Sequence, residues 1–95
     1  MKKIIVNDAE YELIKDYKNT FNEEEFISKY TEYFDDFDYI LGDYSYSKLR
    51  LKGFCCKDNA HFNSINDYND VDNYIKNYCS YNCGYYIVRK NDKKN

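Results

Sequence analysis

The 95-residue sequence contains no proline and no tryptophan, and only three glycines, one histidine and one methionine. Its longest aliphatic run, residues 4–6, is far shorter than the roughly 20 residues that span a bilayer or the ~7 to 15 residues of a signal-peptide core. There is no phosphate-binding glycine loop, no Ser-His-Asp pattern and no HExxH motif. We therefore expect a cytoplasmic protein and favour a non-catalytic role.

Tyrosine, asparagine and lysine are abundant, a usage that AT-rich coding would produce, so their numbers carry little functional information. The residues that run against this bias are more informative, because glycine permits close backbone approach and arginine offers a planar donor fork that lysine lacks. They are Gly42, Gly53, Gly84, Arg50 and Arg89.

The net charge of −3 is unevenly distributed along the chain. Residues 8–43 carry twelve carboxylates and three lysines, whereas residues 44–65 carry four cations and one carboxylate. We expect an electrostatically two-faced domain, although a solvated acidic helix would account for most of the asymmetry.

The four cysteines and the single histidine are the only residues with soft metal-ligand chemistry. Without a secretory signal the thiols are expected to be reduced. The spacing of Cys79 and Cys83 is permissible for a site with His61, but Cys55 and Cys56 are adjacent, so on a strand they would point to opposite faces and could hardly both ligate one ion. Cys79 is expected to pack inside a helix as a small apolar residue, and the other cysteines, Cys83 included, are expected to be incidental. We expect no metal site.

Catalysis by these thiols is disfavoured as well. A thiolate at the C-terminal end of a helix would meet the negative end of the helix dipole, which raises its pKa. Paired carboxylates such as Asp35 and Asp36 extend an acidic surface segment and lack an apolar pocket that would separate their pKa values. No catalytic residue is therefore predicted.

The N-terminal segment predicts a β-hairpin. Residues 3–6 and 10–14 have strand patterns and are joined through Asn7 and Asp8, residue types that tolerate the positive φ of tight turns.

A helix is predicted to follow this hairpin. Asn22 is its expected N-cap, with Glu25 at the third helical position, and Phe21 can pack on Phe26 as a hydrophobic staple. Helical spacing predicts that its buried positions are Phe26, Ile27, Tyr30 and Phe34.

A second hairpin is predicted from residues 39–41 and 48–54. In its second strand Leu49 and Leu51 alternate with Arg50 and Lys52, which is typical of a half-buried strand with one presented face. Residues 55–67 then predict the longest loop, tethered to the core by Phe62 and Ile65.

A second helix is expected to begin at an Asn69 cap, with Asp72 three residues on. Its apolar stripe consists of Val71, Tyr74, Ile75, Tyr78 and Cys79. Asn82 and Gly84 suit a left-handed stop, residues 85–90 resume strand alternation, and residues 91–95 predict a frayed tail.

The resulting order, ββαββαβ, predicts a single small α+β domain over residues 1–90. We expect a mostly antiparallel sheet with two helices packed on one side of it. The pattern leaves the order of the strands in the sheet open.

Four segments of the chain resemble the YutD-like family, a group of small bacterial proteins of Gram-positive type. They are IIVNDAEYELI with the following DY, FNEEEFISKY, DYILGDYSYSKLRLKGF and DNYIKNYCSYNCGYYIVRK. The resemblance spans nearly the whole chain. It implies one cytoplasmic α+β domain and no established reaction, substrate or cofactor.

Relative to the family pattern, four positions of this chain differ. Tyr44 stands where tryptophan is common, Ser45 and Ser47 where glycines are common, and Asp8 where a turn glycine is common. These differences concern loop and anchor geometry, so the implied fold is unaffected.

The candidate binding residues lie in the second hairpin and interleave aromatic with cationic side chains. They are Tyr44, Tyr46, Lys48, Arg50 and Lys52. Tyrosine and arginine are frequent in the energetic centres of protein interfaces, so we expect an unidentified protein partner. The same composition can stack bases and neutralise phosphates, so binding to nucleic acid or the ribosome is the alternative.

Overall fold

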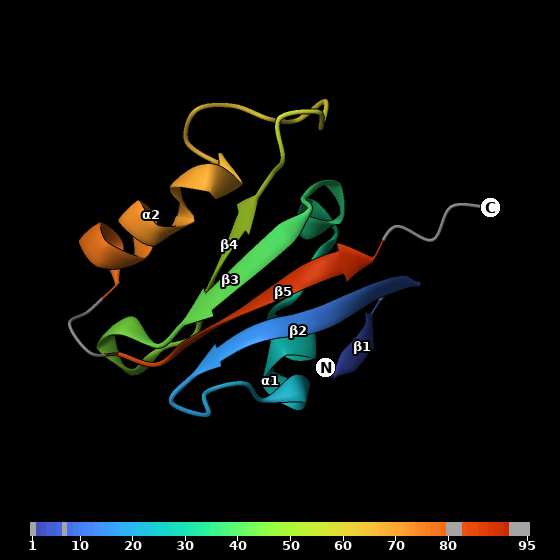
Figure 1. The fold of residues 1–95 in the computed structure, drawn as a ribbon. Coiled ribbons are helices and arrows are strands. Elements are labelled where there is room, and N and C mark those ends of the chain that lie inside the picture. Colours follow the sequence, from blue (N-terminus) through green and yellow to red (C-terminus); the bar gives the residue numbers. More distant parts are fainter. Residues whose placement is uncertain (1, 7, 80–82, 92–95) are drawn as a thin grey trace.

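Five antiparallel strands form one sheet in the order β1-β2-β5-β3-β4 (Figure 1). The computed structural model describes residues 2–6, 8–79 and 83–91, except for the side chain of Tyr46. Its strands are β1 (Lys3–Val6), β2 (Ala9–Tyr17), β3 (Tyr39–Asp43), β4 (Arg50–Phe54) and β5 (Tyr85–Asn91). Its helices are α1 (Glu23–Lys29) and α2 (Val71–Tyr78), with 3-10 turns η1 (Glu32–Asp36), η2 (Ser45–Ser47) and η3 (Tyr68–Asp70). The predicted α+β fold is confirmed.

The two helices cover opposite faces of the sheet, so the expectation that both pack on one side is wrong. Ile40 belongs to the core under α1, whereas its neighbour Leu41 belongs to the core under α2. Val88 and Ile87 divide in the same way on β5. Successive residues of a strand point to opposite faces. The consecutive apolar residues of these central strands are typical of a sheet that is buried on both sides.

The first hairpin is confirmed. β1 pairs with β2 in antiparallel register, with Val6 opposite Ala9, and Asp8 has a φ of 65°. Asn7, the other expected turn residue, lies outside the described residues. Ser47, in the second hairpin, has a φ of 63°. The chain therefore adopts the left-handed conformation at both of these non-glycine positions.

The first helix begins as predicted. Asn22 Oδ1 accepts a hydrogen bond from the backbone N–H of Glu25 at 2.9 Å. The rings of Phe21 and Phe26 pack with their centroids 6.0 Å apart. The prediction that Ile27 is buried is wrong, because the helix ends after two turns and Phe34 lies in the separate turn η1. Spacing across that break does not define a single helical face.

The loop between β4 and α2 is anchored differently from the prediction. Phe62 packs against the core as expected, but Ile65 is 76% exposed, so its predicted tethering role is wrong. The anchor is the buried residue Asn66, whose carbonyl accepts the backbone N–H of Cys55 at 2.7 Å. Its side-chain amide also donates to the carbonyl of His61 at 3.0 Å. A polar residue thus holds the loop through hydrogen bonds.

The cap predicted for the second helix, Asn69, is wrong, because the N-cap position of α2 is Asp70. Asp67 caps the preceding turn η3 by accepting the backbone N–H of Asn69 at 3.0 Å, and α2 follows at Val71. Val71 is buried, and Tyr74, Ile75 and Cys79 pack against the same core, whereas Tyr78 is 65% exposed, so the predicted stripe is wrong only at Tyr78. None of the described helices is long and apolar enough to cross a membrane.

The left-handed stop predicted at Gly84 is not present, because no described glycine has a positive φ. Glycine is needed there for another reason, since a Cβ atom would collide with Thr20 Oγ1. Asn82 lies outside the described residues. Asn91 belongs to β5 and its side-chain amide donates to Glu10 Oε2 at 2.8 Å, which corrects the predicted start of the tail.

Candidate functional site

The second hairpin forms one edge of the sheet, because β4 pairs only with β3 among the described strands. Its candidate binding residues do not share one presented face. Tyr44 is half-buried against the core under α1, whereas Lys48 is exposed. Nothing is described for the side chain of Tyr46. Arg50 and Lys52 point toward the face that α2 covers, and each makes defined contacts there.

Arg50 ties the hairpin to the end of α2. Its Nε and Nη2 atoms both lie 3.0 Å from Asp43 Oδ1, and Nη2 also donates to Ser45 Oγ at 3.2 Å. The same Nη2 atom donates to the carbonyl of Tyr78 at 3.0 Å. Asp43 is only 1% exposed, so Arg50 supplies the positive charge that a buried carboxylate requires. Arg50 is thus engaged within the chain, although 41% of its side chain remains exposed.

Lys52 lies over two aromatic rings. Its Nζ atom is 5.2 Å from the ring centroid of Phe54 and 5.9 Å from that of Tyr74. Burial lowers the pKa of the Lys52 ammonium, while Cys55 acts in the opposite direction. Such contacts hold the lysine stem along apolar surface and leave its charged end near the opening between β4 and α2.

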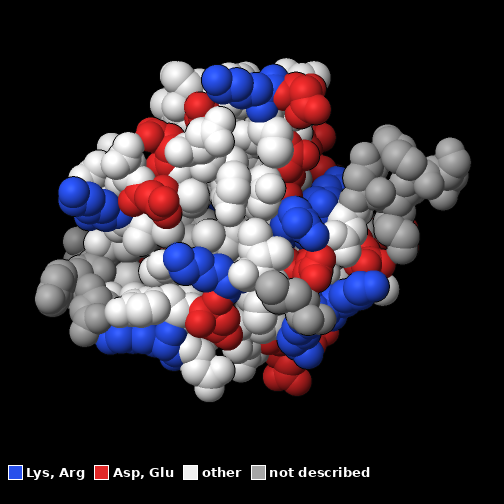
Figure 2. All heavy atoms as spheres, in the orientation of Figure 1, with Lys and Arg blue, Asp and Glu red and all other residues white. Residues whose placement is uncertain are grey.

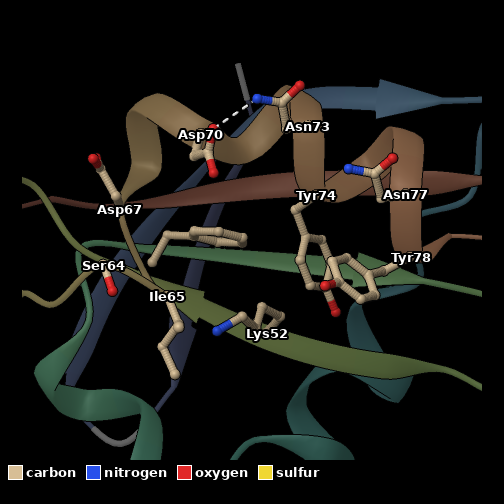
Figure 3. Close-up of a pocket in the computed structure, with 10 residues that line it drawn as sticks. Lys52, Ser64, Ile65, Asp67, Asp70, Asn73, Tyr74, Asn77 and Tyr78 are labelled. Atoms are coloured by element: carbon tan, nitrogen blue, oxygen red, sulfur yellow. Dashed lines mark hydrogen bonds between the residues drawn. The ribbon is translucent and has the colours of Figure 1, made fainter.

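Two shallow grooves flank Lys52. The first, of about 320 Å³, lies between β4, the loop and α2, and Tyr74, Tyr78 and Ile65 line it (Figure 3). The second, of about 270 Å³, is lined by Tyr33 and shares Lys52 and Ile65 with the first. Tyr33 is 68% exposed. The two grooves are therefore adjacent, and together they are here called the edge groove, with three exposed apolar side chains along it.

Charges of both signs surround this region. Figure 2 shows lysine and arginine side chains interspersed with aspartate and glutamate on the face seen in Figure 1, with no continuous cationic surface there. Asp67 and Asp70 line the first groove beside Lys52, and Asp36 lines the second. The edge groove consequently combines apolar side chains with mixed charge.

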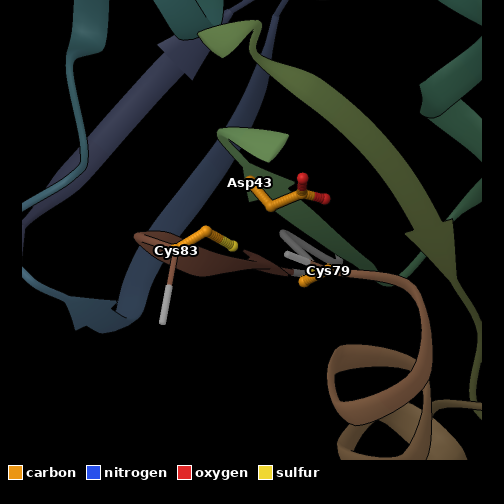
Figure 4. A group of neighbouring side chains, drawn as sticks. All are labelled: Asp43, Cys79 and Cys83. Carbon is orange, nitrogen blue, oxygen red and sulfur yellow. The ribbon is translucent and has the colours of Figure 1, made fainter. Parts of the chain in front are cut away.

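A partly buried cluster lies at the other end of the same hairpin. One ligand-type atom from each of Asp43, Cys79 and Cys83 lies within 4.8 Å of the others (Figure 4). Cys83 Sγ is 4.0 Å from Ser45 Oγ. Burial, followed by the charge of Asp43, raises the pKa of the Cys79 thiol to about 12. This thiol is therefore protonated at neutral pH, as expected for a cysteine that is not a nucleophile.

The remaining soft residues lie at the opposite end of β3. The backbone N–H of Cys56 donates to Asp38 Oδ2 at 2.8 Å, and His61 Nε2 lies 3.6 Å from Asp36 Oδ1. Cys55 directly follows Phe54, which pairs with Tyr39 at the start of β3. The structure thus separates Cys55, Cys56 and His61 from the pair formed by Cys79 and Cys83.

Sequence reasoning missed Asp43 as a partner of the two cysteines. Asp43 is far from both in sequence, and no spacing rule connects a residue of β3 with the end of α2. The available signal was a carboxylate directly after an apolar strand, followed seven residues later by a rare arginine. That pattern could have indicated a buried ion pair.

Comparisons with known proteins agree with this architecture. The YutD-like family, described as "Putative antitoxin YutD-like", matches residues 5–89. A protein of Bacillus subtilis (strain 168) named "Putative antitoxin YutD" is 37% identical over 87 residues, which are 92% of this chain and 96% of that protein. The solution NMR structure of protein yutD from B. subtilis superposes with a TM-score of 0.82 at 35% identity. That match covers 100% of this chain and 86% of the other.

Proposed function

The chain belongs to the YutD-like family, and from this premise we propose that it is a non-catalytic cytoplasmic module that binds a partner protein through the second hairpin. The name of its B. subtilis relative includes the word antitoxin. This name supports a toxin protein as the partner, which the bound module would hold inactive.

The observation that carries the proposal is the exposed apolar surface beside the edge of β4, along which no further strand of the described residues pairs. Ile65, Tyr33 and Tyr78 are each more than 60% exposed and lie along the edge groove. The edge of β4 offers backbone donors and acceptors to an incoming segment, as in strand-addition complexes. Exposed apolar side chains next to such an edge mark interaction surfaces.

The second-hairpin residues have different roles in this proposal. Lys48 and Lys52 can contact the partner directly, because one is exposed and the other lies at the edge groove. Arg50 supports the hairpin from within through Asp43 and the end of α2. Tyr44 contacts the core and can contribute only its accessible side to the partner.

Binding to nucleic acid is the second candidate, and the charge distribution favours it less. Nucleic-acid-binding surfaces concentrate Lys and Arg on one face. Here the cations visible in Figure 2 alternate with carboxylates, and the net charge of the chain is −3. A protein interface with apolar anchors and a mixed polar rim fits this surface better.

Site-specific photo-crosslinking in cells tests the proposal. A photoreactive amino acid at Ile65 should capture one partner protein, whereas the same probe at Ile5 should not. Ile5 is a matched control, because it is 67% exposed and lies on β1 at the opposite edge of the sheet. Ile65→Asp should abolish capture through a second probe at Tyr33, and the variant should keep the wild-type circular dichroism spectrum.

The toxin assignment has its own readout. The captured protein, expressed alone, should arrest growth, and co-expression of the wild-type chain but not of Ile65→Asp should restore it. Equal capture from Ile5 and Ile65 would remove the edge groove from the interface. Nuclease-sensitive binding that weakens steeply with salt would instead support the nucleic-acid candidate.

A further inference from the structure

Independently of partner binding, we propose that Asp43, Cys79 and Cys83 form a binding site for a thiophilic divalent cation of the zinc class. No part of the edge groove contributes to this site. Asp43 ends β3, Cys79 follows the last residue of α2 and Cys83 lies just before β5 (Figure 4). The end of β3 and the connection between α2 and β5, which are distant in sequence, therefore bring their ligand-type side chains close together.

The ligand set suits zinc chemistry. Zinc binds thiolate sulfur at about 2.3 Å and carboxylate oxygen at about 2.0 to 2.2 Å in tetrahedral geometry. Ligand atoms around such an ion are therefore roughly 3.5 to 4 Å apart. Those of Asp43, Cys79 and Cys83 already lie within 4.8 Å of one another, so modest side-chain movement would complete the contacts. Three protein ligands would leave the fourth position to water or to an exogenous group.

The carboxylate is already oriented by its surroundings. Asp43 Oδ1 accepts from Arg50 Nε and from the backbone N–H of Ser45, both at 3.0 Å. Hydrogen bonds of this kind orient a ligating carboxylate and support metal affinity. Arg50 also donates to Ser45 Oγ, which in turn contacts Cys83 Sγ. The supporting residues thus connect the carboxylate with one of the two thiols.

The charge balance is compatible with a buried ion. In the described state the carboxylate of Asp43 is balanced by the guanidinium of Arg50. A divalent cation bound by two thiolates would leave the cluster, with Asp43 and Arg50, without excess charge. A partly buried site without excess charge avoids the desolvation cost of an isolated charge.

Apolar packing alone does not explain why Asp43, Cys79 and Cys83 lie together. A free cysteine commonly behaves as a small apolar residue, and Cys79 does contact the core under α2. Apolar packing gives no reason for two thiols to lie beside a carboxylate, and a hydrogen bond between the Cys79 side chain and Asp43 accounts for only one of them. A shared cation accounts for all three.

Cobalt titration of the reduced full-length chain tests the site. We expect thiolate-to-cobalt charge-transfer absorption that saturates at about one ion per chain, with release of about two protons and displacement of the cobalt by zinc. Cys83→Ser should abolish the absorption. The matched control Cys56→Ser should retain it, because Cys56 lies at the other end of β3.

Several results would overturn the proposal. The proposal is wrong if the folded wild-type chain does not show the absorption, if the absorption survives in Cys83→Ser, or if it disappears in Cys56→Ser. Formation of a Cys79–Cys83 disulfide with peroxide, in a chain that binds no cobalt, would overturn it in favour of a redox pair. Ile65→Asp should bind cobalt like the wild type, so failure of the partner-binding proposal is distinguishable from failure of this one.

Discussion

The two faces of the sheet are packed in different ways. On the α1 face, Phe26, Tyr11 and Tyr86 are fully buried, and their rings meet edge to face with Phe26 at the centre. On the α2 face, Val71 is buried, but Ile75 is only half-buried and Tyr78 is exposed. The difference indicates that the α1 face supplies most of the stabilising burial. The α2 face leaves side chains accessible along the edge groove.

Polar contacts show the same division. On the α1 face, the hydroxyl groups of Tyr11 and Tyr30 lie 2.8 Å apart, and Tyr30 also donates to Asp35. These bonds satisfy polar atoms inside an aromatic core. On the α2 face, Arg50 and Asp43 join the end of the helix to the sheet through a buried ion pair. Aromatic packing therefore dominates the α1 face, whereas on the other face an ion pair adds to the apolar contacts beneath α2.

The largest expected effect tests the packing difference directly. Phe26→Ala should lower the free energy of unfolding by about 3 to 5 kcal/mol, because it leaves a cavity beneath three aromatic rings. Ile75→Ala, on the other face, should cost only about 1 to 2 kcal/mol, since its site can relax toward solvent. Lys76→Ala, exposed on α2, is the control and should change little. Urea denaturation measures all three, and equal losses for Phe26→Ala and Ile75→Ala would contradict the comparison.

The charged connection gives the next effect. Arg50→Met should cost about 3 kcal/mol, because the buried carboxylate of Asp43 would lose its cation. The only other arginine provides the control. Arg89 pairs with Glu12 at 2.8 Å across the sheet surface, and Arg89→Met should cost no more than about 1 kcal/mol. Thermal unfolding distinguishes the two variants, and a stable Arg50→Met variant would show that the ion pair is dispensable.

The smallest effect concerns a polar atom in the aromatic core. Tyr86 Oη is buried without a hydrogen-bond partner in the described part of the chain. Tyr86→Phe should therefore raise the free energy of unfolding by about 1 kcal/mol, whereas Tyr11→Phe, which removes a made bond, should lower it by a similar amount. Chemical denaturation at neutral pH would measure both, and destabilisation by Tyr86→Phe would contradict the assignment.

The stabilities of the wild type and of Tyr86→Phe should also depend differently on pH. Burial holds the pKa of Tyr86 above the ordinary tyrosine value of 10.0, so the folded state keeps its proton where the unfolded state loses it. The wild type should therefore lose stability as the pH rises above about 10, and Tyr86→Phe should lose less. Repeating the denaturation series between neutral and alkaline pH measures this difference.

Local patterns predicted much of the fold. The hairpin turn at Asp8 and the Asn22 cap depend on hydrogen bonds and dihedral angles within a few residues, so the sequence contains all the information needed. The predictions for Ile27 and Tyr78 failed because exposure depends on where a helix ends and on what lies opposite it. For the candidate site, the sequence indicated the second hairpin but not the contacts that its side chains make. Sequence reasoning placed Arg50 on a presented face, and the structure directs it to Asp43 and α2.

By itself, the sequence determined the element order ββαββαβ, the hairpin turns and the start of the first helix, because short-range periodicity and capping chemistry specify them. Tertiary structure decided the central place of β5, the opposite positions of the two helices and the meeting of Asp43 with Cys79 and Cys83. These features result from pairings between segments that are distant in the chain. Such pairings are selected by burial over the whole domain, and no local pattern encodes them.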